Sequence, residues 1–190
     1  MTGTELFELQ RGQKKHDQEF HPDIYYLPYE HRARHLTLHL AKYVGRLAAR
    51  ADPKKAEADL RITLSDTMII VLSFSEILKL DLHEKLIELF GRGSGTHLAE
   101  WGRRIDPGGE YLGKEHLQQW WLYRLAPPTG KMAKALESLD HIEPVNVRKM
   151  LTEGLVDVLA SCIVVAHQLD VDLAQVVRDR WKVIEDNRIF

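Results

Sequence analysis

The sequence predicts an all-α protein, and three observations carry that prediction. Apolar residues recur at helical spacing through several long segments, and no segment alternates polar and apolar residues between turns as a strand would. The segment 64–82 (LSDTMIIVLSFSEILKLDL) aligns without gaps on 155–173 (LVDVLASCIVVAHQLDVDL), at an offset of 91 residues. Such repetition is typical of helical units that bury their apolar faces against copies of themselves, so we expect two tandem repeats of antiparallel helices.

The predicted helices follow one another with short breaks. Their apolar residues keep near-helical spacing, and the two longest are apolar nearly all round, as expected of helices packed on every side. In chain order the predicted helices are Glu30–Arg50, Lys54–Leu80, Leu82–Phe90, Lys114–Arg124, Lys131–Leu139, Asn146–Leu169 and Leu173–Arg188.

Proline, glycine and capping residues predict where these helices break. Pro53 ends the first helix and opens the second, because proline is tolerated in a first helical turn. Asp81 is expected to cap the N-terminus of the third helix, which then stops at the glycine-rich stretch 91–95. That stretch follows a helix rather than a strand and lacks the Lys-Ser or Lys-Thr of a P-loop, so we interpret it as a flexible helix stop.

Three regions follow from these breaks, and together they are expected to form one compact domain. Residues 1–92 hold the first repeat with an N-terminal extension, and residues 130–190 hold the second repeat. Residues 93–129 are expected to form an irregular connector with one short helix and a further break at Pro127-Pro128. Its aromatic residues are interpreted as a clamp onto the bundle, with stacking on a nucleobase as the alternative.

The composition limits the classes of protein to which the chain can belong. Of its 190 residues 44% are apolar, which is ample for a core, and its net charge of −2 provides no general basic field. The single cysteine, Cys162, excludes an internal disulfide and suits a reducing cytoplasm. The N-terminus is too polar for a signal peptide, and no apolar stretch approaches the roughly 20 residues that span a bilayer. We therefore expect a cytoplasmic protein that does not bind a membrane. Nucleic-acid binding through Arg32, Arg34, Arg46 and Arg50 is a third, less favoured option.

Four acidic residues of the second repeat form the main candidate for a chemical site. Glu137 and Asp140 stand three apart on one helix, and Glu153 and Asp157 stand four apart on the next, so each pair shares a helix face. An antiparallel helix pair would bring the two faces together into a hard-oxygen site suited to Mg²⁺. The alternative is that these acids are solvated or bind the backbone or an arginine.

Asp157 has the strongest physical argument of the four, because the helix around it is expected to be buried. A carboxylate left unpaired there would cost several kcal/mol, so it requires a cation, a metal ion or hydrogen-bond donors. Asp66 is its counterpart in the first repeat. Gly154 costs about 1 kcal/mol in an exposed helix, which indicates close approach of a neighbour or a ligand.

The segment 153–159 (EGLVDVL), followed by 169–173 (LDVDL), resembles the MazG-like branch of the all-α nucleotide pyrophosphohydrolase superfamily. Members of this superfamily pair an ExxE motif on one helix with ExxD on the next. They bind Mg²⁺ and split nucleoside triphosphates or related nucleotides into monophosphate and pyrophosphate. The resemblance covers roughly 30–90 and 130–188, and implies a four-helix core of the kind that the tandem and dimeric members build.

The chain departs from the family pattern at several positions. Asp157 matches the last residue of ExxD, but Gly154 stands where the glutamate is expected. In the first repeat Tyr43 and Arg46 stand where acidic residues are expected, and only Asp66 is kept. These departures motivate an alternative to the enzyme, namely a non-catalytic nucleotide-binding or scaffold protein that kept the fold and lost the metal.

The resemblance implies a Mg²⁺-dependent nucleotide pyrophosphohydrolase that forms a homodimer, with a nucleotide as its substrate. The residues that would hold the metal are Glu137, Asp140, Glu153 and Asp157. Lys42 and Lys134 occupy matching positions in the two repeats and are candidates to contact phosphate. His35 and His39 lie on one stripe of the first predicted helix and are candidates to bind substrate or to pack between the repeats. His141, next to Asp140, is the candidate general base.

Overall fold

The computed structural model describes residues 4–49, 56–91, 96–106 and 111–187. Within these ranges the chain is helical and contains no strand, which confirms the predicted all-α class. The helices are α1 (Glu5–Phe20), α2 (Pro22–Tyr25), α3 (Tyr29–Ala48), α4 (Ala56–Leu78), α5 (Leu82–Phe90), α6 (Leu98–Ile105), α7 (Lys114–Asp140), α8 (Val147–Gln168) and α9 (Leu173–Asp186).

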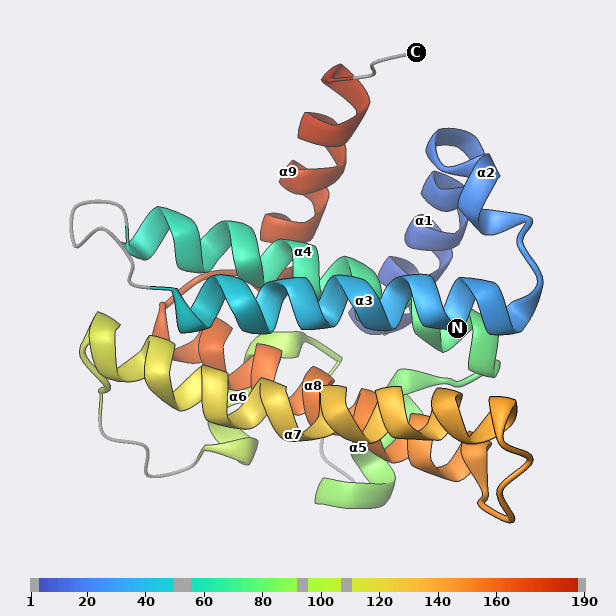
Figure 1. Ribbon diagram of the computed structural model, residues 1–190. Helices are drawn as coiled ribbons and strands as arrows, with labels where there is room; N and C mark the ends of the chain where they lie inside the picture. The colour runs from blue at the N-terminus through green and yellow to red at the C-terminus, as the bar shows by residue number, and fades with distance from the viewer. Residues whose placement is uncertain (1–3, 50–55, 92–95, 107–110, 188–190) are drawn as a thin grey trace.

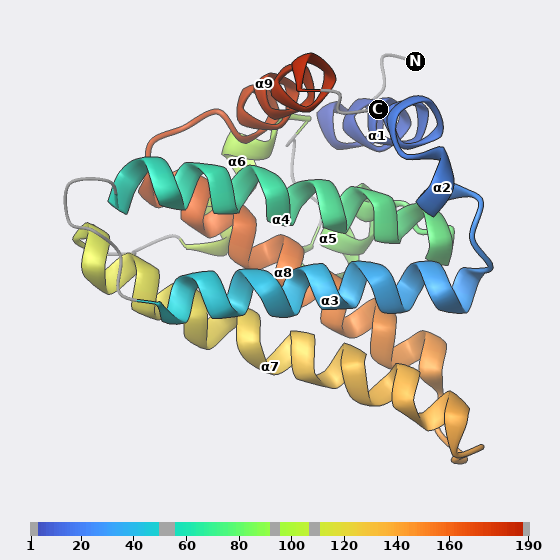
Figure 2. The same cartoon turned by 45° about the horizontal axis from the view of Figure 1, so that its top comes forward.

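Four long helices form the centre of the molecule (Figure 1). α3 packs against α4 and α7, and α8 packs against the same two helices. Figure 2 shows α8 crossing behind α3 and α4, with α1 and α9 on the side of α4 that faces away from α7. α5 and α6 lie against α8. The candidate site lies between α3, α4 and the terminal helices α1 and α9.

The turns that leave α4 and α8 have the same geometry. Lys79 and Asp170, which are 91 residues apart, both have φ of 51°. The amide nitrogen of the residue after each donates to a carbonyl in the last helical turn, and both bonds measure 3.0 Å. Asp81 then caps α5 by accepting from the backbone of His83 and Glu84, as predicted, and Asp172 caps α9 in the same way. The aligned segments therefore share their backbone conformation here.

The predicted break at Pro127-Pro128 is wrong, because α7 continues through both prolines from Lys114 to Asp140. Each proline removes a backbone donor, but its fixed φ is compatible with a helix. The helix is held instead by side chains that are fully buried on either side of the pair, including Trp121, Leu125 and Met132. Much of the predicted irregular connector is consequently helical.

The N-terminal extension also forms a helix, α1, which the apolar pattern did not predict. Its buried positions recur at helical spacing and include Leu6, Leu9 and the polar Gln13. Thr4 caps it, with a side-chain oxygen that accepts from Phe7 N at 3.3 Å. Polar residues at buried positions weaken the periodic signal, and two of them, Gln13 and Asp17, are hydrogen-bonded to each other at 2.7 Å inside the core.

One helix of the described residues, α8, is long and apolar enough to cross a membrane by length and composition alone, contrary to the expectation from the sequence. Most of its apolar window is buried against other helices, however, as in the core helix of a globular domain.

Candidate functional site

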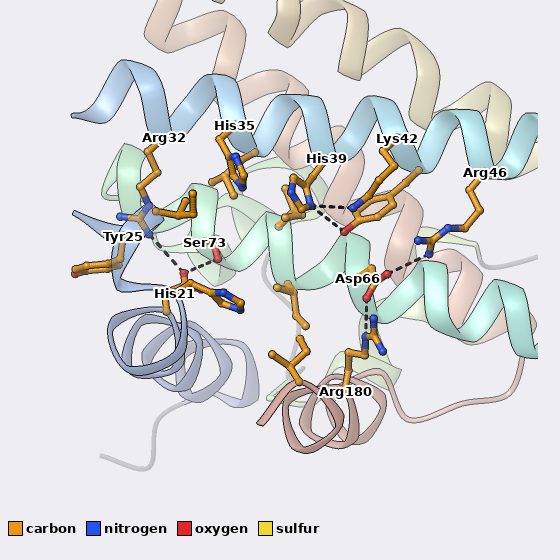
Figure 3. Close-up of a pocket in the computed structure, with 17 residues that line it drawn as sticks. His21, Tyr25, Arg32, His35, His39, Lys42, Arg46, Asp66, Ser73 and Arg180 are labelled. Atoms are coloured by element: carbon orange, nitrogen blue, oxygen red, sulfur yellow. Dashed lines mark hydrogen bonds and ion pairs between the residues drawn. The ribbon is translucent and has the colours of Figure 1, made fainter. Parts of the chain in front are cut away.

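A cavity of about 280 Å³ lies between α3, α4 and α9, with α1 and α2 at one end (Figure 3). Most of its polar wall comes from α3, whose contributing residues recur every three or four positions and so share one face. The charged or hydrogen-bonding side chains that line it are Asp17, His21, Tyr25, Arg32, His35, His39, Lys42, Tyr43, Arg46, Asp66, Ser73 and Arg180.

At one end of the cavity two arginines bind a single buried carboxylate. Asp66 is 7% exposed; its Oδ2 accepts from Arg46 Nη1 at 3.1 Å and its Oδ1 from Arg180 Nε at 2.7 Å. Arg46 belongs to α3 and Arg180 to α9, so the carboxylate joins the first half of the chain to the last helix. Two guanidinium groups on one carboxylate leave one positive charge in excess.

Lys42 adds a second positive charge beside this pair. Its Nζ lies 3.3 Å from His39 Nδ1, and it forms no ion pair with any carboxylate of the described chain. An ammonium group can only donate, so Nδ1 must accept, which places the proton of the neutral ring on Nε2. The Tyr43 hydroxyl lies 3.3 Å from the same Nδ1. His39 therefore has an N–H left to donate elsewhere.

Burial favours the neutral form of His35 and His39. Burial, together with the nearby charges of Lys42 and His35, lowers the pKa of His39 to about 4. Burial also lowers the pKa of His35, whose ring lies 4.6 Å from that of His39 between centroids. Burial raises the pKa of Tyr43, which keeps its hydroxyl proton. The site thus offers neutral donors beside fixed cations.

The opposite end of the cavity is electrically balanced. Arg32 is buried and donates to Glu76 Oε2 at 2.7 Å, and its Nη2 lies 3.5 Å from Asp17 Oδ2. Its guanidinium also stacks on the Tyr25 ring at 4.5 Å from the centroid, and Ser73 Oγ donates to Asp17 Oδ2 at 2.6 Å. Arg32 and Asp17, the charged residues that line this end, cancel one another, and Glu76 lies outside the lining and also pairs with Lys79. The excess positive charge of the cavity therefore lies at the end formed by Lys42, Arg46 and Arg180.

Three of the candidate substrate-binding residues, His35, His39 and Lys42, line this cavity together. Lys134 does not, because it lies on α7, where its Nζ binds Glu143 at 2.9 Å and Glu137 at 3.0 Å. Arg180 was not singled out from the sequence. It lies 114 residues from Asp66, and no local pattern links the two.

The candidate metal ligands occupy exposed positions, and three of them already bind cations. Glu137 pairs with Lys134, and Asp140 accepts from Arg34 Nη1 at 2.9 Å. Glu153 accepts from Lys131 at 2.5 Å. In the part of the chain that the structure describes, no three His, Cys, Asp or Glu residues form a group that could hold a metal ion. The four carboxylates therefore do not converge into a Mg²⁺ centre in this structure.

The expectation that Asp157 is buried is wrong, because its side chain is exposed on a face of α8 that lines a second cavity. The apolar residues around it are buried on the other faces of the helix. Gly154 has the predicted close neighbour: a Cβ there would lie 2.6 Å from Met132 Cγ on α7. His141 is exposed in the turn after α7 and lines neither of these two cavities.

Comparison of the chain with protein-family models, with curated proteins and with solved structures finds no match. Function is therefore inferred from the side chains that line the first cavity.

Proposed function

We propose that the protein binds a small phosphate-bearing ligand in the cavity between α3, α4 and α9. The observation that carries this proposal is the charge of one end of the cavity. Lys42, Arg46 and Arg180 line it, and Asp66 is the one carboxylate among the described residues that pairs with any of them. The excess of two positive charges matches a phosphate monoester, which carries about −1.5 to −2 at neutral pH and has three acceptor oxygens.

The donors needed for such a ligand are held in place before it binds. Arg180 uses Nε for Asp66, and within the described chain its two Nη groups have no protein acceptor. His39 can donate from Nε2, and Lys42 can turn from the imidazole toward a charged acceptor. Because Asp66 already holds both guanidinium groups, little side-chain entropy is lost when phosphate binds, and this preorganisation supports affinity.

The size of the cavity narrows the ligand class. At about 280 Å³ it is just below the roughly 300–1,000 Å³ of sites for drug-sized ligands. That volume suits a phosphate with a sugar attached better than a nucleoside triphosphate. A sugar phosphate, or the phosphate end of a nucleoside monophosphate, is the ligand that we propose.

Of the two functions that the sequence suggests, this proposal corresponds to non-catalytic nucleotide binding rather than to Mg²⁺-dependent hydrolysis. The exposed and individually paired carboxylates give the hydrolase no support. We further propose that the α3–α4 and α7–α8 pairs are tandem repeats of a MazG-like four-helix core. The turns shared by α4 and α8 and the mutual packing of the four helices support that relationship.

Isothermal titration calorimetry with ribose 5-phosphate and with adenosine monophosphate tests the binding proposal. We expect Lys42→Ala and Arg180→Ala each to raise the Kd about tenfold or more, because a hydrogen bond to a charged group contributes about 1.5–3 kcal/mol. Lys149→Ala is the matched control, because this exposed lysine lies on α8 outside the cavity. Binding of neither compound, or equal weakening by the control variant, would refute the proposal.

A further inference from the structure

The second cavity is larger, about 630 Å³, and lies along α7 and α8 with walls from α5, α6 and the segment before α7. Its wall is mainly apolar and aromatic. The lining residues that give it this character are Phe90, Ile105, Leu112, Trp120, Tyr123, Pro127, Pro128, Ala160 and Val164. Polar and charged residues form the rest of the wall, and a concave site that combines apolar and aromatic side chains with a smaller number of polar groups is usual for a small molecule.

Most polar groups of this wall are already satisfied by the protein. Gln168 accepts from the backbone of Leu112 at 3.0 Å and donates to Asp106 at 2.9 Å. Ser161 Oγ accepts from the Trp121 indole at 3.2 Å and donates to the carbonyl of Val158 at 2.8 Å. These groups therefore shape the cavity and leave little capacity for a ligand.

Asp157 is different, because its carboxylate has no hydrogen bond or ion pair with any described residue. Lys131 is the nearby cation on α7, but it binds Glu153 instead. Burial raises the pKa of Asp157, and the charges of Lys131 and Arg124 offset only part of that rise. A ligand cation would supply the missing partner.

The charge and the aromatic rings of the cavity favour the same kind of ligand. Two carboxylates, Asp106 and Asp157, face one guanidinium, that of Arg124, so the wall has a net charge of about −1. The Arg124 guanidinium lies 5.4 Å from the centroid of the Trp120 ring, so a cation already stacks at this wall. Mg²⁺ would find a single unpaired carboxylate here, which is too few oxygen ligands to replace its hydration.

We propose that this cavity binds an organic amine, with its ammonium group on Asp157 and its apolar or aromatic body against Trp120 and Tyr123. The site is separate from the phosphate site, since the two cavities share no lining residue. Its lining has a net negative charge, so it would bind a cationic ligand, whereas the first cavity would bind an anionic phosphate.

Titration with 2-phenylethylamine tests the proposal, with 2-phenylethanol as an uncharged ligand of nearly the same shape. We expect the amine to bind saturably and the alcohol to bind at least tenfold more weakly. Asp157→Asn should weaken the amine about tenfold or more and leave the alcohol unchanged. Trp120→Leu should weaken both compounds, because it removes part of the apolar wall. Circular dichroism of each variant confirms that it folds.

Asp170→Asn is the matched control, because Asp170 is an exposed aspartate in the turn after α8 and lies outside the cavity. It should leave the affinity for the amine unchanged. Equal binding of the amine by Asp157→Asn and the native protein overturns the proposal, as does the absence of saturable binding to the native protein. Lys42→Ala should leave binding of the amine unchanged. The outcome for the amine site is therefore independent of the outcome for the phosphate site.

Discussion

Asp66 and Asp157 stand 91 residues apart at matching positions of two similar helices, yet their surroundings are opposite. Asp66 is buried and binds two arginines, whereas Asp157 faces an open cavity and forms no ion pair with any described residue. The difference comes from the neighbouring helices. α4 packs against α3 and α9, which each present an arginine that pairs with Asp66, whereas Arg124 on the α7 wall near Asp157 stacks on Trp120 instead. The same residue type can thus recur at matching positions of two helices and make different interactions at each.

The helices also approach their neighbours differently at these two places. Gly154 admits Met132 of α7 at a distance that no side chain would allow. The corresponding residue of α4 is Thr63, whose hydroxyl instead lies 3.4 Å from Arg46 Nη1. The first half therefore uses this position to hold a cation of the cavity, and the second half uses it to pack two helices closely.

The largest effect is expected from removing the charge at Asp66. Asp66→Asn leaves two guanidinium groups without their shared carboxylate, and we expect it to lower the free energy of unfolding by about 2 kcal/mol or more. Asp157→Asn should leave the protein as stable as before or more stable, since it removes a carboxylate without a partner. Urea denaturation of both variants at pH 7 makes the comparison. Equal destabilisation would show that the two aspartates have the same role.

The difference in stability between Asp157→Asn and the native protein should change with pH in a defined direction. Because the folded pKa of Asp157 is raised, the folded state binds this proton more tightly than the unfolded chain does. The native protein is therefore penalised above that pKa and recovers as the pH falls through it. Any advantage of the variant should be largest at neutral pH and disappear in acid. A stability difference that grows in acid would contradict the unpaired state of this carboxylate.

A slightly smaller effect is expected where α7 meets α8. Gly154→Ala forces a methyl group against Met132, and we expect a loss of about 1–3 kcal/mol. Gly130→Ala is the control, because it lies in α7 with no atom within 4 Å of an added Cβ. That control should be neutral or stabilising by up to about 1 kcal/mol, as is usual for glycine in a helix. Thermal unfolding of both variants measures the difference.

A still smaller effect is expected from protonation of the first cavity. Because the folded pKa of His39 is depressed to about 4, the unfolded chain binds this proton first as the pH falls. Stability should therefore decline between about pH 6.5 and 4, and His39→Gln should reduce that decline. The control is His31→Gln, an exposed histidine on the same helix that does not line the cavity. Melting temperatures across this range should show the same slope for the control and the native protein.

The smallest effect, none at all, is expected from removing divalent metal. If phosphate is held by Lys42, Arg46 and Arg180 alone, EDTA should leave the Kd for ribose 5-phosphate unchanged. Calorimetry with and without EDTA and added Mg²⁺ provides the measurement. Affinity that depends on Mg²⁺ would return the carboxylates of α7 and α8 to consideration.

Much of the fold could be predicted because its signals are local. The apolar periodicity predicted α3, α4, α8 and α9 to within a few residues, and Asp81 was placed correctly as a cap. The sequence predicted a break within α7 that does not exist, because buried side chains on both sides of the prolines outweigh their helix-breaking tendency. Tertiary packing decided that case.

The site was only partly predictable. The spacing of His35 and His39 placed them on one stripe of a single helix, and Lys42 was a candidate through its match to Lys134. The pairing of Asp66 with Arg180 joins distant segments, and no helical pattern contains it. The sequence did indicate that Asp157 is exposed, because Glu153, Asp157 and Ala160 form a less apolar stripe along an otherwise apolar helix. The many apolar residues around Asp157 outweighed that indication.

The attachment of α9 through Arg180 has a consequence for how the molecule moves. α9 packs against α1 and α4 at the edge of the bundle, and Arg180 reaches from it to a carboxylate of α4 beside the cavity. A ligand bound by both Arg180 and Lys42 would add a further contact between α9 and the central helices. Amide protons along α9 should then exchange with solvent more slowly when the cavity is filled, so the end of the chain would report on occupancy.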